Sequence, residues 1–131
     1  MSTVPPIAGV HHIKIPVSDI GRSRAWYESV LGLRVEAEFP DEDGVVRGVA
    51  GSLSDPSGRV VLSVALRQNP EVSAGLGGFD PLSLSVPEHA DLQRWVEHVV
   101  AAGFEPPRVA NAVAALHDPD GHEIRLFSPE H

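Results

Sequence analysis

Two stretches of the chain combine a tight turn with a strand of alternating residues. Residues 118–121 are Asp-Pro-Asp-Gly, and residues 55–58 are Asp-Pro-Ser-Gly. Aspartate and proline favour the start of a turn, and glycine supplies the positive φ near its end. The residues that follow have the period of two that is typical of a half-buried strand. The chain therefore contains an internal repeat, and we expect this repeat to determine the fold.

The first half of the repeat predicts one strand, one helix and three more strands. The initial strand covers residues 10–17. A helix follows over residues 20–31, because Asp19 can cap its first turn and Gly32 favours the left-handed conformation that ends a helix. The three strands expected after this helix span residues 33–39, 45–53 and 59–66.

The second half repeats this order. A strand at residues 81–86 leads into a helix that starts at Pro87 and ends before Gly103, and the strands expected after it span residues 104–108, 110–117 and 122–127. The sequence thus predicts one α+β domain over residues 1–131, built from two tandem βαβββ modules. The first module covers about 8–66, the connecting loop about 67–80, and the second module about 81–128.

The connecting loop contains three glycines and a proline, so we expect no regular element within it. It could act as a mobile lid or as a plain linker.

Composition excludes several classes of function. The net charge of −8 argues against a nucleic-acid partner, because the phosphate backbone requires a basic surface. No apolar run approaches the length of a membrane span, and no signal peptide is recognisable, so we expect a cytoplasmic protein without a membrane partner. The chain has no cysteine, which excludes a disulfide, a thiolate nucleophile and a cysteine-type metal site.

Alternation along three strands places polar side chains on one face of the predicted sheets. If the apolar residues of these strands pack against the helices, the opposite face carries His12, Lys14, Ser83, Ser85, Glu123 and Arg125. Such a face can be the solvated side of a two-layer fold, or it can line a cavity.

Four motifs resemble the vicinal oxygen chelate superfamily. They are His-Ile-Lys-Ile-Pro-Val-Ser-Asp at residues 12–19, Arg-Ser-Arg-Ala-Trp-Tyr at 22–27, Leu-Gly-Leu at 31–33, and the Asp-Pro-Asp-Gly turn at 118–121. This group includes glyoxalase I, extradiol dioxygenases, methylmalonyl-CoA epimerase and the bleomycin and fosfomycin resistance proteins. The resemblance implies curled mixed sheets around a shared cavity, helices on the outer face, and a homodimer. It does not imply one reaction.

The resemblance also implies positions for metal ligands. These positions fall on His12, Leu62, Pro81 and Arg125. Leucine and proline have no donor, and a guanidinium repels a cation, so we expect no divalent metal and no other cofactor. A substitute site from His11, His117 or His122 is the alternative, although the pattern places His11 on the opposite face from His12 and His122 in an exposed turn.

We therefore expect a small-molecule-binding protein with a cavity for a small polar or anionic compound. Lys14 and Arg125 would bind the anion, and the further ligand-binding candidates are Arg47, Ser83, Ser85, His117 and Glu123. Alternatively, Arg125 and Glu123 form a structural ion pair. The other functional hypothesis is a lyase, isomerase or dioxygenase of the glyoxalase/dioxygenase type that acts on a small carbonyl or carboxylate compound. It would use His12 as a general base with Arg125, without a metal or with a rearranged metal site.

Overall fold

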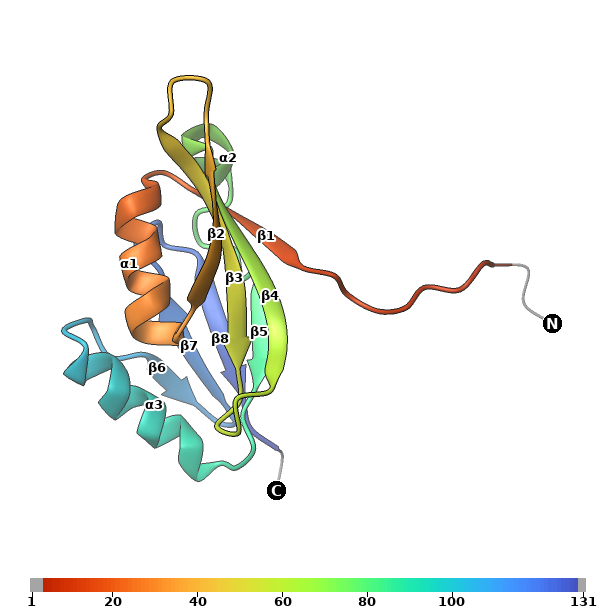
Figure 1. Cartoon of the computed structure of the whole chain (residues 1–131). Coiled ribbons are helices and arrows are strands. Elements are labelled where there is room, and N and C mark those ends of the chain that lie inside the picture. The colour runs from red at the N-terminus through yellow and green to blue at the C-terminus, as the bar shows by residue number, and fades with distance from the viewer. Residues whose placement is uncertain (1–3, 130–131) are drawn as a thin grey trace.

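The computed structural model describes residues 4–129 and shows two modules with the same order of elements (Figure 1). The first module contains β1 (Ile13–Val17), α1 (Ile20–Leu31), β2 (Arg34–Pro40), β3 (Val46–Ser54) and β4 (Val60–Gln68). After α2 (Pro70–Gly75), the second contains β5 (Leu82–Ser85), α3 (Ala90–Ala101), β6 (Arg108–Ala110), β7 (Val113–His117) and β8 (Glu123–Phe127). The α+β fold with two tandem βαβββ modules is confirmed.

Each module forms its own four-stranded mixed sheet. The order is β1-β4-β3-β2 in the first sheet and β5-β8-β7-β6 in the second. In each sheet the first strand of the module pairs in parallel with its last strand, and the other neighbouring strands are antiparallel. The internal repeat seen in the sequence is therefore a repeat of topology.

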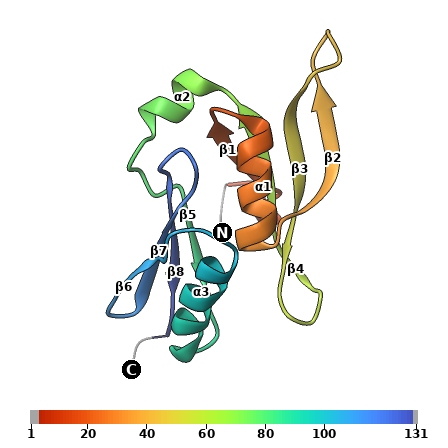
Figure 2. The same cartoon turned by 90° about the vertical axis from the view of Figure 1, so that its left-hand side faces the viewer.

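The hydrophobic core lies on the helix side of the sheets. In Figure 2, β2 and β3 of the first sheet lie to the right of α1 and the second sheet lies to its left. In β1, Ile15 and Val17 are fully buried, whereas Lys14 is exposed. In β8, Ile124 and Leu126 are likewise buried and alternate with less buried residues. The alternation in the sequence thus predicted correctly which face of these strands packs inward.

Helix α1 begins and ends at the residues that the sequence indicated. The Asp19 side chain accepts a hydrogen bond from the Arg22 backbone N–H at 3.0 Å. Gly32 has a φ of 72°, and the Leu33 backbone N–H bonds to the Tyr27 carbonyl at 3.0 Å. These contacts satisfy backbone groups that would otherwise be free at the two ends of the helix.

Three tight turns share one geometry, and they begin at Asp41, Asp55 and Asp118. In each turn one carboxylate oxygen accepts the backbone N–H groups two and four residues later, at 2.8–3.0 Å. The glycine three residues after the aspartate has a φ between 79° and 90°. The aspartate side chain and the glycine together fix each turn, and the turns predicted at residues 55–58 and 118–121 are confirmed.

The connecting segment 67–80 differs from the prediction. Strand β4 continues to Gln68, and α2 occupies Pro70–Gly75. The Asn69 side chain caps α2 by accepting the Val72 N–H at 3.2 Å. The expectation of no regular element was wrong because a proline at the first helical position loses no intrahelical hydrogen bond.

Two predicted strands and one helix start also shift. The strand expected at 104–108 lies at Arg108–Ala110, since Pro106 and Pro107 have no N–H for the ladder. The first strand begins at Ile13 rather than at residue 10, and the N-terminal segment extends away from the sheet (Figure 1). Helix α3 begins at Ala90, three residues after Pro87. No helix within residues 4–129 is long and apolar enough to cross a membrane.

Candidate functional site

The face of the first sheet that points away from the core is hollowed into an open cavity of ≈480 Å³. Its floor consists of small side chains. Ala65 of β4 lies opposite Ala50 of β3, which in turn lies opposite Ala37 of β2. Because directly opposed residues point to the same face, the three methyl groups form one row across the sheet.

Phe39 borders this floor. It pairs with Gly48 on β3, and a β-carbon at Gly48 would lie 3.7 Å from the Phe39 ring. This distance is an ordinary van der Waals contact, so the ring lies close to the sheet beside Gly48. Phe39 is 52% exposed, so much of its aromatic surface is free to contact a ligand.

Two cations stand at the β1–β4 side of the cavity. Lys14 lies opposite Ala65, and Arg67 follows Ala65 by two residues on the same face of β4. Both side chains are exposed, and within residues 4–129 neither forms an ion pair. These two positive charges are thus available to an anion.

A carboxylate lies at the opposite side of the floor. Strand β2 has a bulge between Val35 and Ala37, and this irregularity makes Glu36 the extra residue. Glu36 lines the cavity and accepts a hydrogen bond from the Ser52 hydroxyl at 2.6 Å. The bond to Ser52 fixes the position of the only acidic side chain among the described residues that line this cavity.

His11 and His12 lie at the mouth of the same cavity, with their Nδ1 atoms 2.9 Å apart. The expectation that they point to opposite faces was wrong, because both precede the start of β1 at Ile13 and are not constrained by strand alternation. His12 and Lys14 are the predicted site residues that the structure brings together in this cavity.

The predicted site residues of the second module lie elsewhere. Ser83 lies opposite Arg125 on the open face of the second sheet, and none of Ser83, Ser85, Glu123 and Arg125 lines the first-sheet cavity. The Arg125 guanidinium is 3.0 Å from Glu123 and 3.2 Å from Asp80. Within the chain, Arg125 therefore forms the ion pair that was the alternative to a ligand contact.

The two remaining candidates lie apart from the first-sheet cavity. Arg47 forms an ion pair with Asp41 at 3.1 Å, at the β2–β3 turn. His117 lines a second cavity of ≈480 Å³ that is bordered by α1, α3 and the segment between α3 and β6. Its Nε2 is 4.0 Å from a Glu123 oxygen.

The residues present do not fit the metal site that the resemblance implies. His12 borders the first sheet, whereas Pro81 directly precedes β5 and Arg125 lies in β8 of the second sheet. Leu62 packs against the core. Arg125 lies opposite Ser83 in the second sheet, and the residue in the corresponding place of the first sheet, opposite Lys14, is Ala65 rather than Leu62. In the described part of the chain, no three His, Cys, Asp or Glu side chains are grouped to hold an ion.

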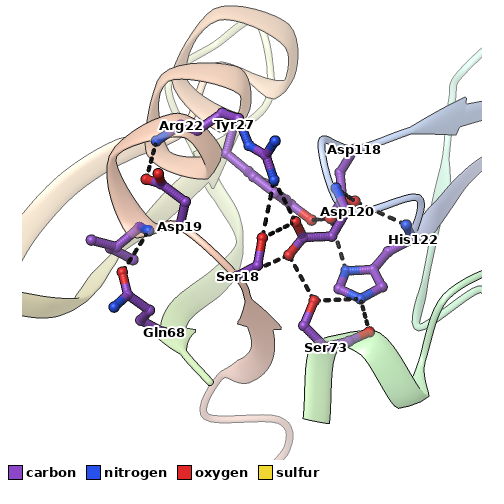
Figure 3. A network of polar contacts seen from close by, with 10 residues as sticks. Ser18, Asp19, Arg22, Tyr27, Gln68, Ser73, Asp118, Asp120 and His122 are labelled. Atoms are coloured by element: carbon purple, nitrogen blue, oxygen red, sulfur yellow. Dashed lines mark hydrogen bonds and ion pairs between the residues drawn. The ribbon is translucent and has the colours of Figure 1, made fainter. Parts of the chain in front are cut away.

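A network of polar side chains, buried or half-buried except for the exposed Arg22, joins the two modules and α2 (Figure 3). It consists of Ser18, Arg22, Tyr27, Ser73, Asp118, Asp120 and His122. At its centre, the Asp120 carboxylate accepts hydrogen bonds from the Ser18 backbone and hydroxyl at 2.6 and 2.5 Å, and from the Ser73 hydroxyl at 2.6 Å. The Arg22 guanidinium lies 2.9 Å from the same carboxylate.

His122 also belongs to this network, although its turn position predicted exposure. Its side chain is fully buried, with Nδ1 2.9 Å from Asp118 and Nε2 3.3 Å from the Ser73 carbonyl. The Tyr27 hydroxyl donates to the same Asp118 oxygen at 2.8 Å. The prediction was wrong because α2, whose Ser73 lies against Nε2 of the ring, is far away in sequence.

Ser73, His122 and Asp118 have the residue types of a hydrolytic triad, but they cannot act as one here. The Ser73 hydroxyl lies 3.3 Å from His122 and donates instead to Asp120. Ser73 and His122 are both buried, and neither lines either cavity. A nucleophile must reach its substrate, so this cluster is structural.

The environment of the buried network shifts two pKa values. Burial favours the protonated form of Asp120, but hydrogen bonds from Ser18 and Ser73 and the Arg22 charge outweigh it and lower the pKa of that carboxyl. Burial, and then the charge of Asp118, raise the pKa of the Tyr27 phenol far above its usual value. The network therefore favours an ionised Asp120 beside a neutral Tyr27.

Comparison with known proteins agrees with this architecture. The profile of the Glyoxalase/Bleomycin resistance protein/Dioxygenase superfamily matches residues 9–126. The chain belongs to this superfamily. No curated protein sequence matches it, so the likeness to individual glyoxalase-superfamily members comes from solved structures.

Three of these structures share the fold over nearly their whole length. A glyoxylase/bleomycin resistance protein/dioxygenase domain from Frankia sp. EAN1pec is 24% identical, with a TM-score of 0.66 over 96% of this chain and 95% of that one. The fosfomycin resistance protein FosX from Listeria monocytogenes is 16% identical, with a TM-score of 0.64 over 95% of each chain. UcmS2 is 19% identical, with a TM-score of 0.67 over 93% of this chain and 98% of that one.

Sequence reasoning missed Glu36, Phe39 and Arg67 at this glyoxalase-superfamily cavity. The bulge in β2 interrupts the alternation that would have placed Glu36 and Phe39. Arg67 was assigned to the connecting loop, but β4 extends to Gln68. Val64 and Leu66 are apolar and alternate with residues on the other face of the strand. Extending this alternation by one residue places Arg67 beside Ala65 on the open face.

Proposed function

We propose that this glyoxalase-superfamily protein binds a small polar or anionic compound on the open face of its first sheet, without the usual metal site. The observation that carries the proposal is the pair of unpaired cations, Lys14 and Arg67, on one side of a ≈480 Å³ cavity. A guanidinium and an ammonium that converge on one anion form charge-assisted hydrogen bonds. Arg125 is less available, because Glu123 and Asp80 already neutralise it.

Isothermal titration with succinate and benzoate tests this proposal. We expect Lys14→Met and Arg67→Met each to weaken binding by about tenfold, since each removes one charge-assisted contact. Arg94→Gln is the matched control, because Arg94 is an exposed cation on α3 outside the cavity. Binding that persists in the Lys14→Met/Arg67→Met double variant would refute the proposed site.

A second candidate function is an enzyme of the glyoxalase/dioxygenase type that acts on a small carbonyl or carboxylate substrate. It is favoured by the position of His12, which lines the same cavity as Lys14. His12 would remove a proton next to a carbonyl while Lys14 stabilises the negative charge that develops. Deuterium exchange at the methyl group of pyruvate measures this step. Exchange catalysed equally by the wild type and by His12→Ala would exclude His12 as the base.

We also propose that two copies of the chain pair through their open faces. Three large apolar side chains, Phe39, Val61 and Phe127, are 40–57% exposed on these faces. A partner's second sheet would bring Arg125 towards the first-sheet cavity, which is the arrangement in which Arg125 could contact a ligand. Light scattering should show a dimer that Val61→Glu dissociates and Val100→Glu, at an exposed position of α3, does not. A monomeric wild type at high concentration would contradict this.

A further inference from the structure

We infer that the ligand of the first-sheet cavity is a planar aromatic acid with a hydrogen-bond donor at the end opposite its carboxylate. This inference rests on the proposed function, because it assigns a ligand class to the same cavity. It follows from the shape of the floor and from the distribution of charge around it.

The floor suits a flat molecule. Ala37, Ala50 and Ala65 lie in one row on three neighbouring strands, so only methyl groups rise above the sheet there. The row spans two strand spacings, or about 10 Å, which is long enough for a fused pair of rings. The exposed Phe39 ring stands beside the floor and offers aromatic surface to a ligand lying on it.

The charged groups lie at opposite ends of this row. Lys14 is directly beside Ala65 at one end, and Arg67 follows on the same face. Glu36 is next to Ala37 at the other end. One Glu36 oxygen accepts from Ser52, and the other has no partner within residues 4–129. The cavity is therefore matched to a ligand with a carboxylate at one end and an O–H or N–H donor at the other.

Other anionic ligands match the cavity less well. A sugar acid presents hydroxyl groups on both faces of its ring. The three alanines have no polar side-chain atom to bind them, and among the described residues that line the cavity Ser63 alone offers a side-chain hydroxyl. A short aliphatic acid would satisfy the cations but leave the floor and Phe39 in water. The combination of a flat apolar floor and two opposite poles favours an aromatic ring system between two polar groups.

Calorimetric titration with four probes of similar size tests this ligand class. The probes are 2-naphthoate, 6-hydroxy-2-naphthoate, trans-decahydro-2-naphthoate, which is puckered, and 2-naphthalenemethanol, which is flat and uncharged. We expect 2-naphthoate to bind about tenfold more tightly than either the puckered acid or the alcohol. The 6-hydroxyl group should strengthen binding further, and Glu36→Gln should remove that gain without weakening 2-naphthoate.

Two alanine substitutions report on the floor itself. Ala37→Val and Ala50→Val raise the floor by two methyl groups each, and both should weaken 2-naphthoate more than succinate. Ala110→Val, at an exposed position of β6 in the second sheet, is the matched control. Melting curves identify any variant that fails to fold, and the exposed Ala37 position keeps the test available if Ala50→Val does not fold.

The outcomes separate this inference from the proposed function. If succinate and benzoate bind through Lys14 and Arg67 but the puckered acid binds as tightly as 2-naphthoate, the planar ligand class is wrong and the anion site stands. If 2-naphthoate binds with unchanged affinity after Ala37→Val and Ala50→Val, its ring does not lie on this floor. If no carboxylate binds, both the ligand class and the anion site are wrong.

Discussion

Asp55 and Asp118 begin the same turn in the two modules, but only Asp118 also belongs to the buried network. In both turns one carboxylate oxygen accepts two backbone N–H groups at 2.9–3.0 Å. The second oxygen of Asp118 also accepts the Tyr27 hydroxyl at 2.8 Å and lies 2.9 Å from His122 Nδ1. Replacing each aspartate by alanine removes these backbone contacts in both turns. Asp55→Ala also removes the bond from the Ser57 hydroxyl at 2.6 Å, whereas Asp118→Ala also removes the two buried contacts.

We expect Asp118→Ala to lower the free energy of unfolding by roughly 3–5 kcal/mol, because it leaves two buried polar groups without a partner. Asp55→Ala should cost clearly less, since its turn faces solvent. Urea unfolding followed by tryptophan fluorescence measures both, because Trp26 packs edge-on against Tyr27 with ring centroids 4.9 Å apart. Equal losses for the two variants would refute the argument that the buried network stabilises the junction between modules.

A milder variant covers the case in which Asp118→Ala does not fold. Tyr27→Phe removes one hydrogen bond to Asp118 and keeps the aromatic packing, so it should cost about 1 kcal/mol. A Tyr27→Phe protein as stable as the wild type would show that the Tyr27–Asp118 contact contributes nothing.

Three further predictions concern Asp120, Gly51 and Gly75. Burial acts to raise the pKa of Asp120, but its hydrogen bonds and the Arg22 charge outweigh burial and lower this pKa in the folded protein. The ionised Asp120 therefore stabilises the fold fully above the unfolded-state pKa of about 4, and this contribution is lost as pH falls through the lower folded-state pKa. Melting temperature against pH should therefore fall less steeply below about pH 4 in Asp120→Asn than in the wild type. A β-carbon on Gly51 would lie 2.1 Å from the Arg34 carbonyl oxygen, so Gly51→Ala should cost more than about 3 kcal/mol. Gly75→Ala, with open space around it, should leave urea stability unchanged or raise it by about 0.5 kcal/mol.

Features that depend on nearby residues were predictable from the sequence. The turns at Asp41, Asp55 and Asp118 follow from aspartate and glycine at fixed spacing, and their geometry is the same in all three. The buried faces of β1 and β8 follow from simple alternation, which also placed Lys14 on the open face. The order of the elements follows from the internal repeat, so the fold was accessible without a structure.

Features that depend on distant contacts were not predictable. The burial of His122 depends on α2, whose Ser73 lies against its ring, and α2 itself was missed. The position of Glu36 depends on a bulge that disrupts the alternation of β2. The distribution of Lys14 and Arg125 over two sheets follows from the pairing of strands within each module, which alternation along a single strand does not report.

The position of Lys14 and Arg125 on different sheets changes which residues we expect to bind an anion. The sequence placed Lys14 and Arg125 on one face and expected both to bind an anion. In the chain they lie on different sheets, and Arg67 rather than Arg125 accompanies Lys14 in the cavity. The central claim is therefore that an anion binds at Lys14 and Arg67.

A crystal of the protein soaked in 4-bromobenzoate tests that claim most directly, because the anomalous signal of bromine locates the ring. The account predicts a bromine peak above Ala50, with the carboxylate directed to Lys14 and Arg67 and the bromine towards Glu36. A bromine peak beside Arg125 on the second sheet, with none above Ala50, would contradict it. The absence of any ordered peak in a crystal with an accessible cavity would also contradict it.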